Sequence, residues 1–235
     1  MADAGVASRR KAEELIKNGD VKVDGEIITT LGYKVTGEED IEVKGQKIKK
    51  EEKVVFILNK PKNVISTVKD DKGRLCVGDL IETDYRLFPV GRLDYESSGL
   101  LIMTNDGALT NKIIHPKFRI PKVYEVTVKG DITIKEISKL KKGVVLDDGF
   151  KTGKCEIYHV DSNPNKKTHR YIVTIYEGHN REIRKMFKTV GAEVIRLHRT
   201  KEACIEIGDL RSGEYRRLKI HEVKMLKRYL DGSDL

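Results

Sequence analysis

The stretch FPVGRLDYESSGLLIMTNDG, residues 88–107, decides the fold of this chain and raises the question of its function. Two apolar runs, residues 87–90 and 100–103, stand on either side of a short loop. Their length and their neighbours predict two buried strands. Gly91 and Gly99 stand at the edges of the loop, where the backbone can turn sharply or approach a ligand closely. The pattern is typical of a loop presented by a rigid frame.

Asp94 lies on this loop, between the two predicted strands. A carboxylate so placed can act as a nucleophile or as a base on a bound substrate. It can equally serve the backbone, by accepting amide hydrogen bonds or by forming an Asx turn with Glu96 or Ser97. From the loop alone, the two interpretations of Asp94 have equal weight.

The composition predicts a globular protein of the cytoplasm. The chain has 235 residues, of which 38% are hydrophobic and 35% charged. No apolar run approaches the roughly 20 residues that span a bilayer. The beginning of the chain, MADAGVASRR, lacks the apolar core of a secretory signal. We expect no contact with a membrane.

No metal or organic cofactor is predicted. Cys76, Cys155 and Cys204 are far apart and form no CxxC pair, which favours neither a disulfide framework nor a zinc site. The six histidines form no HExxH pattern. The chain also has no GxGxxG and no GxxxxGK[ST], so dinucleotide or triphosphate chemistry has no local support.

The charge predicts a polyanionic partner and places it in the second half of the chain. The formal net charge is +9 and the sequence pI is about 9.3. Residues 1–50 hold ten basic and ten acidic residues, whereas residues 151–201 hold twelve basic and five acidic ones. RNA or DNA is the favoured partner, and a solvated lysine-rich surface is the alternative.

The first part of the chain predicts a small αβ module. Residues 8–18 form a short helix in this interpretation, with Ser8 as its cap and Gly19 at its end. The sequence VKVDGEII, residues 21–28, then predicts a hairpin around an Asp-Gly turn.

Arg9, Arg10 and Lys11 crowd the first turn of this predicted helix. The helix macrodipole disfavours cations there, so a partner such as phosphate would compensate the cost. Basic first turns also occur on ordinary solvated helices. We predict these three residues as RNA contacts.

Residues 47–53 are polar and charged and predict a linker. The chain beyond it predicts an α+β domain with a mixed, mostly antiparallel sheet, because strands dominate and helices intervene irregularly. The predicted strands are 54–59, 87–90, 100–103, 123–130, 170–178, 193–198 and 203–207, and the predicted helices are 108–114, 133–143, 180–191 and 218–230.

On the predicted helix 180–191, which Asn180 would cap, Arg184 lies nearer the buried face than the other cations. Its planar fork can pair with a carboxylate, and a pair with Asp94 would hold that acid ionised. An arginine snorkelling at a helix boundary is the alternative. The buried face is marked by Ile183, Met186, Phe187 and Val190, and the cations that point to water or phosphate are Arg181, Lys185 and Lys188.

Tyr124 alternates with Val126 and Val128 on one face of a predicted strand. A core aromatic is the commoner reason for such a pattern. A tyrosine at the mouth of an active site would instead stack on a planar base and offer its hydroxyl as a polar contact.

A series of segments resembles one known family. GRLDYESSGLLIMTNDG, residues 91–107, resembles the signature loop of the pseudouridine synthases, in particular of the RsuA/RluB branch that modifies ribosomal RNA. SRRKAEELIKNGDVKVDG, residues 8–25, resembles the alpha-L RNA-binding motif of that branch. The other matching segments follow in the family's order: LNKP at 58–61, GRL at 73–75, IHP at 114–116, KVY at 122–124 and EGHNREIRKMF at 177–187.

The resemblance implies a role for each matching residue. Asp94 stands for the essential aspartate of the family, and Arg92 for the arginine that helps to extrude the target base. Tyr124 stands for the tyrosine that stacks on the target uracil. Arg184 stands for the basic residue that pairs with the aspartate, and Leu197 for an apolar position that lines the pocket.

The chain departs from the family at three points. Ser97 stands where threonine is common, which keeps the hydroxyl. His179 stands where arginine is usual, which we expect to weaken one phosphate contact. Members of the family usually have a short helix before the ADAG segment, so we expect the first module to lack its first helix.

Together these patterns predict an alpha-L RNA-binding module at 1–46, a linker at 47–53 and a pseudouridine synthase domain at 54–235. The predicted activity is isomerisation of uridine to pseudouridine in ribosomal RNA or a pre-ribosomal particle, by a monomer and without a cofactor. IHP and KVY favour large-subunit RNA. The alternative is a non-catalytic RNA-binding or ribosome-assembly factor, against which Asp94, Tyr124 and Arg184 argue. An RNA methyltransferase would need a glycine-rich cofactor loop, and none is visible.

Overall fold

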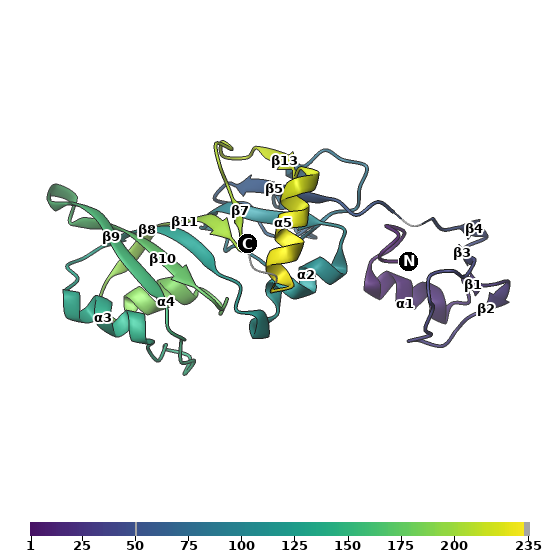
Figure 1. The fold of residues 1–235 in the computed structure, drawn as a ribbon, viewed down its shortest axis with the longest axis horizontal. Helices are drawn as coiled ribbons and strands as arrows, with labels where there is room; N and C mark the ends of the chain where they lie inside the picture. Colours follow the sequence, from purple (N-terminus) through teal and green to yellow (C-terminus); the bar gives the residue numbers. More distant parts are fainter. Residues whose placement is uncertain (50, 233–235) are drawn as a thin grey trace.

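The computed structural model describes residues 1–49 and 51–232, which form a small N-terminal module and a larger part built on one long sheet (Figure 1). The predicted linker contains Lys50, and the predicted synthase domain ends in residues 233–235. These four residues lie outside the described part of the chain.

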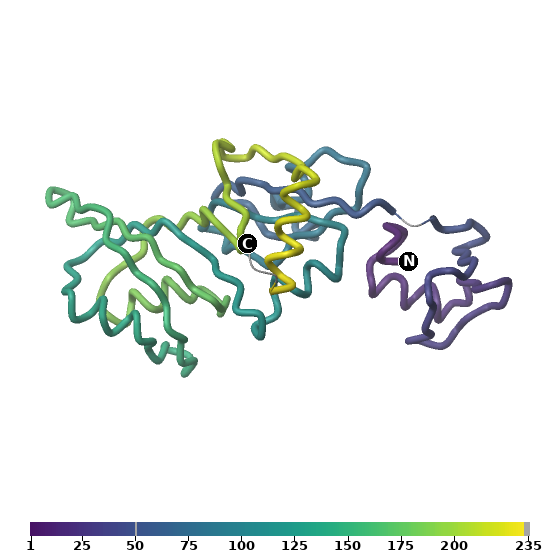
Figure 2. The backbone as a smooth tube through the Cα atoms, viewed as in Figure 1, coloured from purple at the N-terminus to yellow at the C-terminus, as the bar shows by residue number. Residues whose placement is uncertain are grey.

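The N-terminal module packs one helix on a small antiparallel sheet. Ser8 caps the helix by accepting a hydrogen bond from the Lys11 amide, as predicted. Ala12 and Leu15 of this helix join Val43 in the core of the module. Figure 2 shows residues 1–49 gathered at one end of the molecule. The elements are α1 (Arg9–Lys17), β1 (Val21–Val23), β2 (Glu26–Ile27), β3 (Ile41–Val43) and β4 (Gln46–Lys47), with the strands in the order β2-β1-β3-β4.

The described residues of the larger part form a nine-stranded sheet whose central path is β13-β5-β7-β11-β8-β10-β9. Within this part of the chain, only β7 and β11 pair in parallel, so the predicted mixed, mostly antiparallel sheet is confirmed. The strands are β5 (Val55–Lys60), β6 (Phe88–Pro89), β7 (Ser98–Thr104), β8 (Lys122–Lys129), β9 (Glu156–Asn163), β10 (Thr168–Ile175), β11 (Glu193–Glu202), β12 (Ile205–Glu206) and β13 (Tyr215–Arg217).

Two pairs of helices cover the sheet. The helices α2 (Gly107–Ile114) and α5 (Ile220–Leu230) share one core with the face of β5 and β7 that carries Ile57 and Leu100. The helices α3 (Ile134–Lys142) and α4 (Glu182–Lys188) lie at the other end, beside β8 and β10 (Figure 1). The predicted buried face of α4 is confirmed at Ile183, Met186 and Phe187.

The parallel pairing of β7 with β11 joins the two halves of the sheet. It is short: Ser98 lies opposite His198, and Gly99 lies opposite Arg199. Gly99 has φ +110°, and a Cβ there would lie 2.2 Å from the Arg199 carbonyl oxygen. The Arg199 Nε also donates to the Leu100 carbonyl at 2.7 Å. Only a glycine lets the two strands approach this closely.

The start of α4 differs from the sequence prediction. Arg181, and not Asn180, is the N-cap residue, and it has φ +54° and forms no side-chain cap. The Glu182 carboxylate instead accepts a hydrogen bond from the His179 amide at 2.9 Å. This bond closes the turn before the helix, so the Asn180 side chain is not needed there.

We expect Gly99→Ala to lower the free energy of unfolding by more than about 3 kcal/mol, since strain at positive φ adds to a backbone clash at the joint of the sheet. Urea denaturation followed by circular dichroism measures the change. Gly213→Ala is the matched control, because Gly213 has φ +87° but no atom within 4 Å of the added Cβ. Its cost should stay at about 1 kcal/mol, and equal losses in the two variants would contradict the close approach.

Candidate active site

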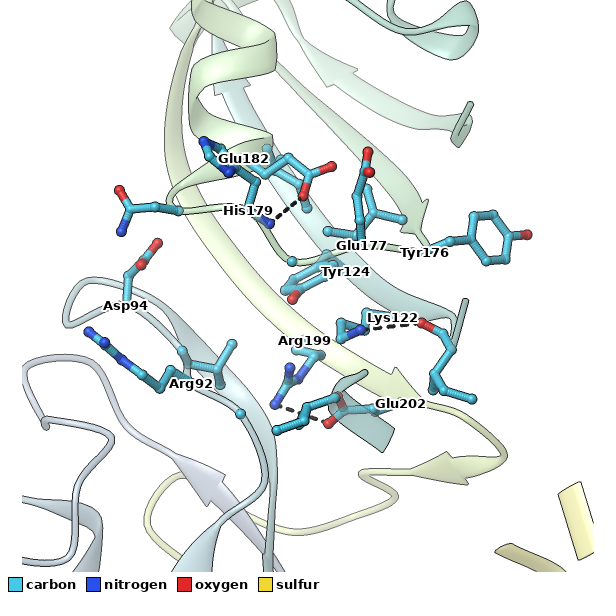
Figure 3. A pocket seen from close by; sticks show the side chains of 18 of the residues that line it. Arg92, Asp94, Lys122, Tyr124, Tyr176, Glu177, His179, Glu182, Arg199 and Glu202 are labelled. Atoms are coloured by element: carbon cyan, nitrogen blue, oxygen red, sulfur yellow. Dashed lines mark hydrogen bonds and ion pairs between the residues drawn. The ribbon is translucent and has the colours of Figure 1, made fainter. Parts of the chain in front are cut away.

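A cavity of about 590 Å³ opens where the two halves of the sheet meet (Figure 3). The loop that carries Asp94 forms one wall, and β8, β11 and the start of α4 contribute to the rest of the lining. Of the residues predicted from the sequence, five line this cavity: Arg92, Asp94, Tyr124, Arg181 and Leu197. The structure therefore brings together most of the predicted substrate contacts.

The segment that follows β5 holds the Asp94 loop. The Ser66 hydroxyl donates to the Leu93 carbonyl at 2.7 Å and accepts from the Leu93 amide at 3.1 Å. The Asn63 amide donates to the Tyr95 carbonyl at 2.8 Å. The loop is therefore anchored on both sides of Asp94.

Asp94 itself stays available to a ligand. Its backbone carbonyl accepts from the Ser97 amide at 3.0 Å, which closes a turn. Within residues 1–49 and 51–232, its carboxylate accepts no backbone hydrogen bond and forms no ion pair. The described structure therefore contains no Asx turn formed by this carboxylate. Figure 3 shows the Asp94 side chain directed into the cavity from the loop.

Lys60 is a buried cation behind the same loop, and we did not single it out from the sequence. Its ammonium donates to the Ser97 carbonyl and to the Pro61 carbonyl, both at 2.9 Å. Burial lowers the pKa of Lys60 to about 8, and the Asp94 carboxylate acts in the opposite direction. Lys60 thus ties the end of the loop to β5 and places a positive charge near Asp94. The LNKP segment was the available signal.

Arg184 contacts the loop but not the Asp94 carboxylate. It donates to the Val194 carbonyl at 2.9 Å, and to the Glu96 carbonyl and the Ser97 hydroxyl, both at 3.4 Å. The expected ion pair with Asp94 is not formed among the described residues. Burial lowers the pKa of Arg184, and Glu96 partly offsets this effect. The side chain lies over the main chain of the loop, so its position supports the loop and not the acid itself.

Tyr124 and Leu197 come from neighbouring strands opposite the loop. Tyr124 on β8 is only 7% exposed, and burial raises the pKa of its hydroxyl. Leu197 lies on β11 and is also buried. In Figure 3 the Tyr124 ring lies across the cavity from Asp94 and Arg92. A planar base in this cavity would have an aromatic wall on one side and a carboxylate on the other.

A buried ion pair lies next to Tyr124. Arg199 and Glu202, both on β11, are 2% and 1% exposed, and their charged groups are 3.2 Å apart. Lys122 also lines the cavity; burial lowers its pKa, and Glu202 acts against that change. These residues carry no local signal in the sequence, because residues i and i+3 of a regular strand face opposite ways, and the pairing of β11 with β8 is irregular between Arg199 and Lys201.

Glu182 is a second buried acid that the sequence analysis missed. It is 4% exposed and lines the cavity at the start of α4. Burial raises the pKa of Glu182 to about 8, and the neighbouring Glu177 adds to the effect. His179, just before α4, stacks on Phe150 with ring centroids 4.0 Å apart and contacts Asp148 at 2.8 Å.

The predicted RNA contacts fall into separate places. Arg181 pairs with Glu96 of the Asp94 loop at 2.9 Å. Lys185 pairs with Asp148, and Lys188 lies 3.5 Å from Asp147. None of the three N-terminal cations lines the cavity, and all are exposed on α1: Arg9, Arg10 and Lys11.

Residues 1–49 and 51–232 contain no group of three or more His, Cys, Asp or Glu side chains placed to hold a metal ion. Among the same residues, no helix has both the length and the apolar character needed to cross a membrane.

Comparison with known proteins identifies the family. Residues 54–189 match the model of the RNA pseudouridylate synthase family, and residues 1–41 match that of the S4 domain. Ribosomal large subunit pseudouridine synthase B of Bacillus subtilis is 47% identical over 98% of this chain and 95% of that protein. An uncharacterized RNA pseudouridine synthase of Aquifex aeolicus is 41% identical over 96% of this chain and 91% of that protein.

A solved structure agrees. The crystal structure of a pseudouridylate synthase matches with a TM-score of 0.68 and 26% identity, and it covers 96% of each chain. The chain therefore belongs to the RNA pseudouridylate synthase family, which confirms the resemblance found in the sequence, and it carries an S4 domain at its N-terminal end.

The buried Glu182 predicts a dependence of stability on pH. Because its pKa is about 8 in the folded protein and lower when unfolded, the folded state keeps a proton that the unfolded state loses. Its contribution to stability is complete below the unfolded pKa and is lost as the pH rises through about 8. We expect the free energy of unfolding of the wild type, minus that of Glu182→Gln, to fall from about pH 5 to about pH 8.

Urea denaturation at a series of pH values measures this difference. Glutamine keeps an oxygen that accepts from the His179 amide, so the variant should fold. Glu193→Gln, at an exposed position on β11, is the control, and its difference from the wild type should stay constant. A constant difference for Glu182→Gln would contradict the proton assigned to this acid.

Proposed function

We propose that this protein isomerises uridine to pseudouridine in ribosomal RNA, and specifically in large-subunit RNA. The bond between C1′ and N1 breaks and a bond between C1′ and C5 forms. C5 loses a proton and N1 gains one, so the reaction transfers no group to or from a second substrate and needs no oxidant. The glycosidic bond of a uridine stacked within RNA is out of reach of the enzyme, so the nucleotide must be flipped into the cavity.

One observation carries this proposal: Asp94 is held by its neighbours at the cavity, yet its carboxylate has no ion-pair partner among the described residues and lies across from Tyr124. A free carboxylate beside the ribose can attack C1′ as a nucleophile or take a ribose proton as a base. In both routes the acid must be ionised. Lys60 and Arg184 place two positive charges against the loop that carries this acid.

The other side chains of the cavity suit the uracil ring. The buried Tyr124 offers a flat face for stacking, and Leu197 adds apolar contact. Arg92 is exposed on the same loop as Asp94, where it can enter the RNA stack as the base leaves it. These roles match those that the family resemblance implies.

Ribosomal RNA is the substrate class that the relatives support. The Bacillus subtilis relative bears the name of a large-subunit synthase, and the S4 match lies where we predict the RNA-binding module. In this proposal residues 1–46 bind RNA through Arg9, Arg10 and Lys11, residues 47–53 are a linker, and residues 54–235 are the catalytic domain. The protein acts in the cytoplasm, as a monomer, on ribosomal RNA or a pre-ribosomal particle.

We expect Asp94→Asn to fold and to bind RNA, but to lower the rate of pseudouridine formation by at least about 10³-fold, which corresponds to about 4 kcal/mol of barrier. Purified protein is incubated with a large-subunit RNA transcript, and pseudouridine is mapped by carbodiimide-blocked reverse transcription. The physical reason is that an amide can neither attack C1′ nor accept a ribose proton at a useful rate.

Asp84→Asn is the matched control, since it makes the same chemical change at an exposed residue of the same domain. It should keep full activity. Activity of Asp94→Asn near that of the control would remove Asp94 from the reaction. If the folded wild type produced no stop at any uridine, the alternative of a non-catalytic RNA-binding factor would replace the enzyme.

A further inference from the structure

A second, more open groove of about 810 Å³ adjoins the cavity of Asp94. Arg181 lines both spaces, and Glu96 of the Asp94 loop lines the groove. The groove lies between three segments: the turn that follows β5, the Asp94 loop, and the connection from α4 to β11. Its lining includes four cations, which are Lys62, Arg181, Arg184 and Lys188, and two acids, which are Glu96 and Glu193.

The cations of the groove are incompletely used by the protein. Arg181 has Glu96 as its ion-pair partner, at 2.9 Å, and both side chains are substantially exposed. The buried Arg184 Nε has no hydrogen-bond acceptor within the described residues. Lys62 forms no ion pair in that part of the chain. An anionic ligand in the groove would therefore gain contacts without first displacing a buried structure.

The position of the groove indicates which anion it fits. A flipped uridine in the cavity remains covalently joined to its strand on both sides. The strand must therefore pass over the rim beside Asp94, and the groove begins at this rim because Arg181 and the loop are common to both spaces. A groove that is lined by Lys and Arg and tracks a backbone is the usual way to hold a single strand.

We propose that this groove binds the phosphodiester backbone of the RNA strand next to the flipped uridine, and that the Glu96 carboxylate occupies Arg181 until a phosphate replaces it. The inference rests on the proposed function, because it assigns the substrate strand of the same site. It separates the predicted RNA contacts: Arg181 and Lys188 line the groove, with Lys188 3.5 Å from the exposed Asp147, whereas Lys185 pairs with Asp148 and lies outside the groove lining.

A phosphate can replace the Glu96 carboxylate at Arg181 without disturbing the structure of the Asp94 loop. Its carbonyl is contacted by Arg184, and the loop is also fixed through Leu93 and Ser97. Only the exposed Glu96 side chain has to rotate away from Arg181. The exchange therefore couples arrival of the backbone to a loop whose Asp94 is already in place.

The first test measures the binding of a fluorescein-labelled oligouridylate to the full chain by fluorescence anisotropy, over a series of NaCl concentrations. We expect the double variant Lys62→Ala/Lys188→Ala to bind more weakly. The slope of log affinity against log salt should become shallower by about 0.7 for each lost phosphate contact, or about 1.4 in total. An unchanged slope would overturn the proposal.

The control is Lys135→Ala/Lys139→Ala, which removes the same charge from exposed positions on α3 outside the groove. Its slope and affinity should match those of the wild type. If it shifted the slope as much as the groove variant, binding would depend on overall charge and the groove would have no special part. Inorganic phosphate, added at matched ionic strength, should not displace the oligouridylate; displacement would indicate a site for a single anion.

The exchange of Glu96 is tested by a second pair of variants. Glu96→Gln should bind the same oligouridylate about 2- to 5-fold more tightly, since an exposed ion pair no longer competes for Arg181. Glu193→Gln removes the same charge from the same groove, and Glu193 has no ion pair among the described residues. Equal gains in the two variants would overturn the exchange and leave only a general effect of charge.

Failure of this inference and failure of the proposed function are distinguishable. If the wild type forms pseudouridine while the groove variants bind RNA as the control does, the groove is wrong and the enzyme stands. If the groove variants weaken binding while no pseudouridine forms, the strand contact stands without the reaction.

Discussion

The contact between Gly99 and Arg199 is the constraint on which the rest of the larger part depends. Here β7 and β11 form a parallel pairing of only two residue pairs, and it joins two antiparallel half-sheets. A side chain at Gly99 would meet the Arg199 backbone, so the junction requires the absence of a Cβ. Because the Asp94 loop leads directly into β7 and Tyr124 lies on β8 beyond β11, this approach sets the distance across the cavity.

In the joined sheet, the surrounding side chains form hydrogen bonds with the backbone of the Asp94 loop and not with the Asp94 carboxylate. Ser66, Lys60 and Arg184 contact carbonyls or a hydroxyl of the loop, and Asp94 has no ion-pair partner among the described residues. Support through the main chain keeps the carboxylate in place without occupying its oxygens.

The sequence was informative wherever the signal was local. Periodicity and caps predicted α1, the buried face of α4 and the alternation in β8, because these depend on residues that are close along the chain. The family resemblance implied one site for Asp94, Tyr124 and Leu197, and the three residues line one cavity. Lys60 and Glu182 were not identified, since their properties come from burial by distant segments. The Arg199–Glu202 pair was not identified, since it depends on an irregularity in the pairing of β11 with β8. The predicted ion pair between Arg184 and Asp94 was wrong, because helix geometry gives the direction of a side chain but not the atom that it reaches.

Arg199 links the architecture directly to the site. Its Nε holds the Leu100 carbonyl at the junction, and its guanidinium lies in a buried pair with Glu202 beside Tyr124. A buried pair is a poor source of stability, because desolvation costs about as much as the attraction returns. Its value here is geometric. The group that fixes the register of β7 against β11 also lies at the tyrosine, so stability of the junction and placement of the ring cannot be changed independently.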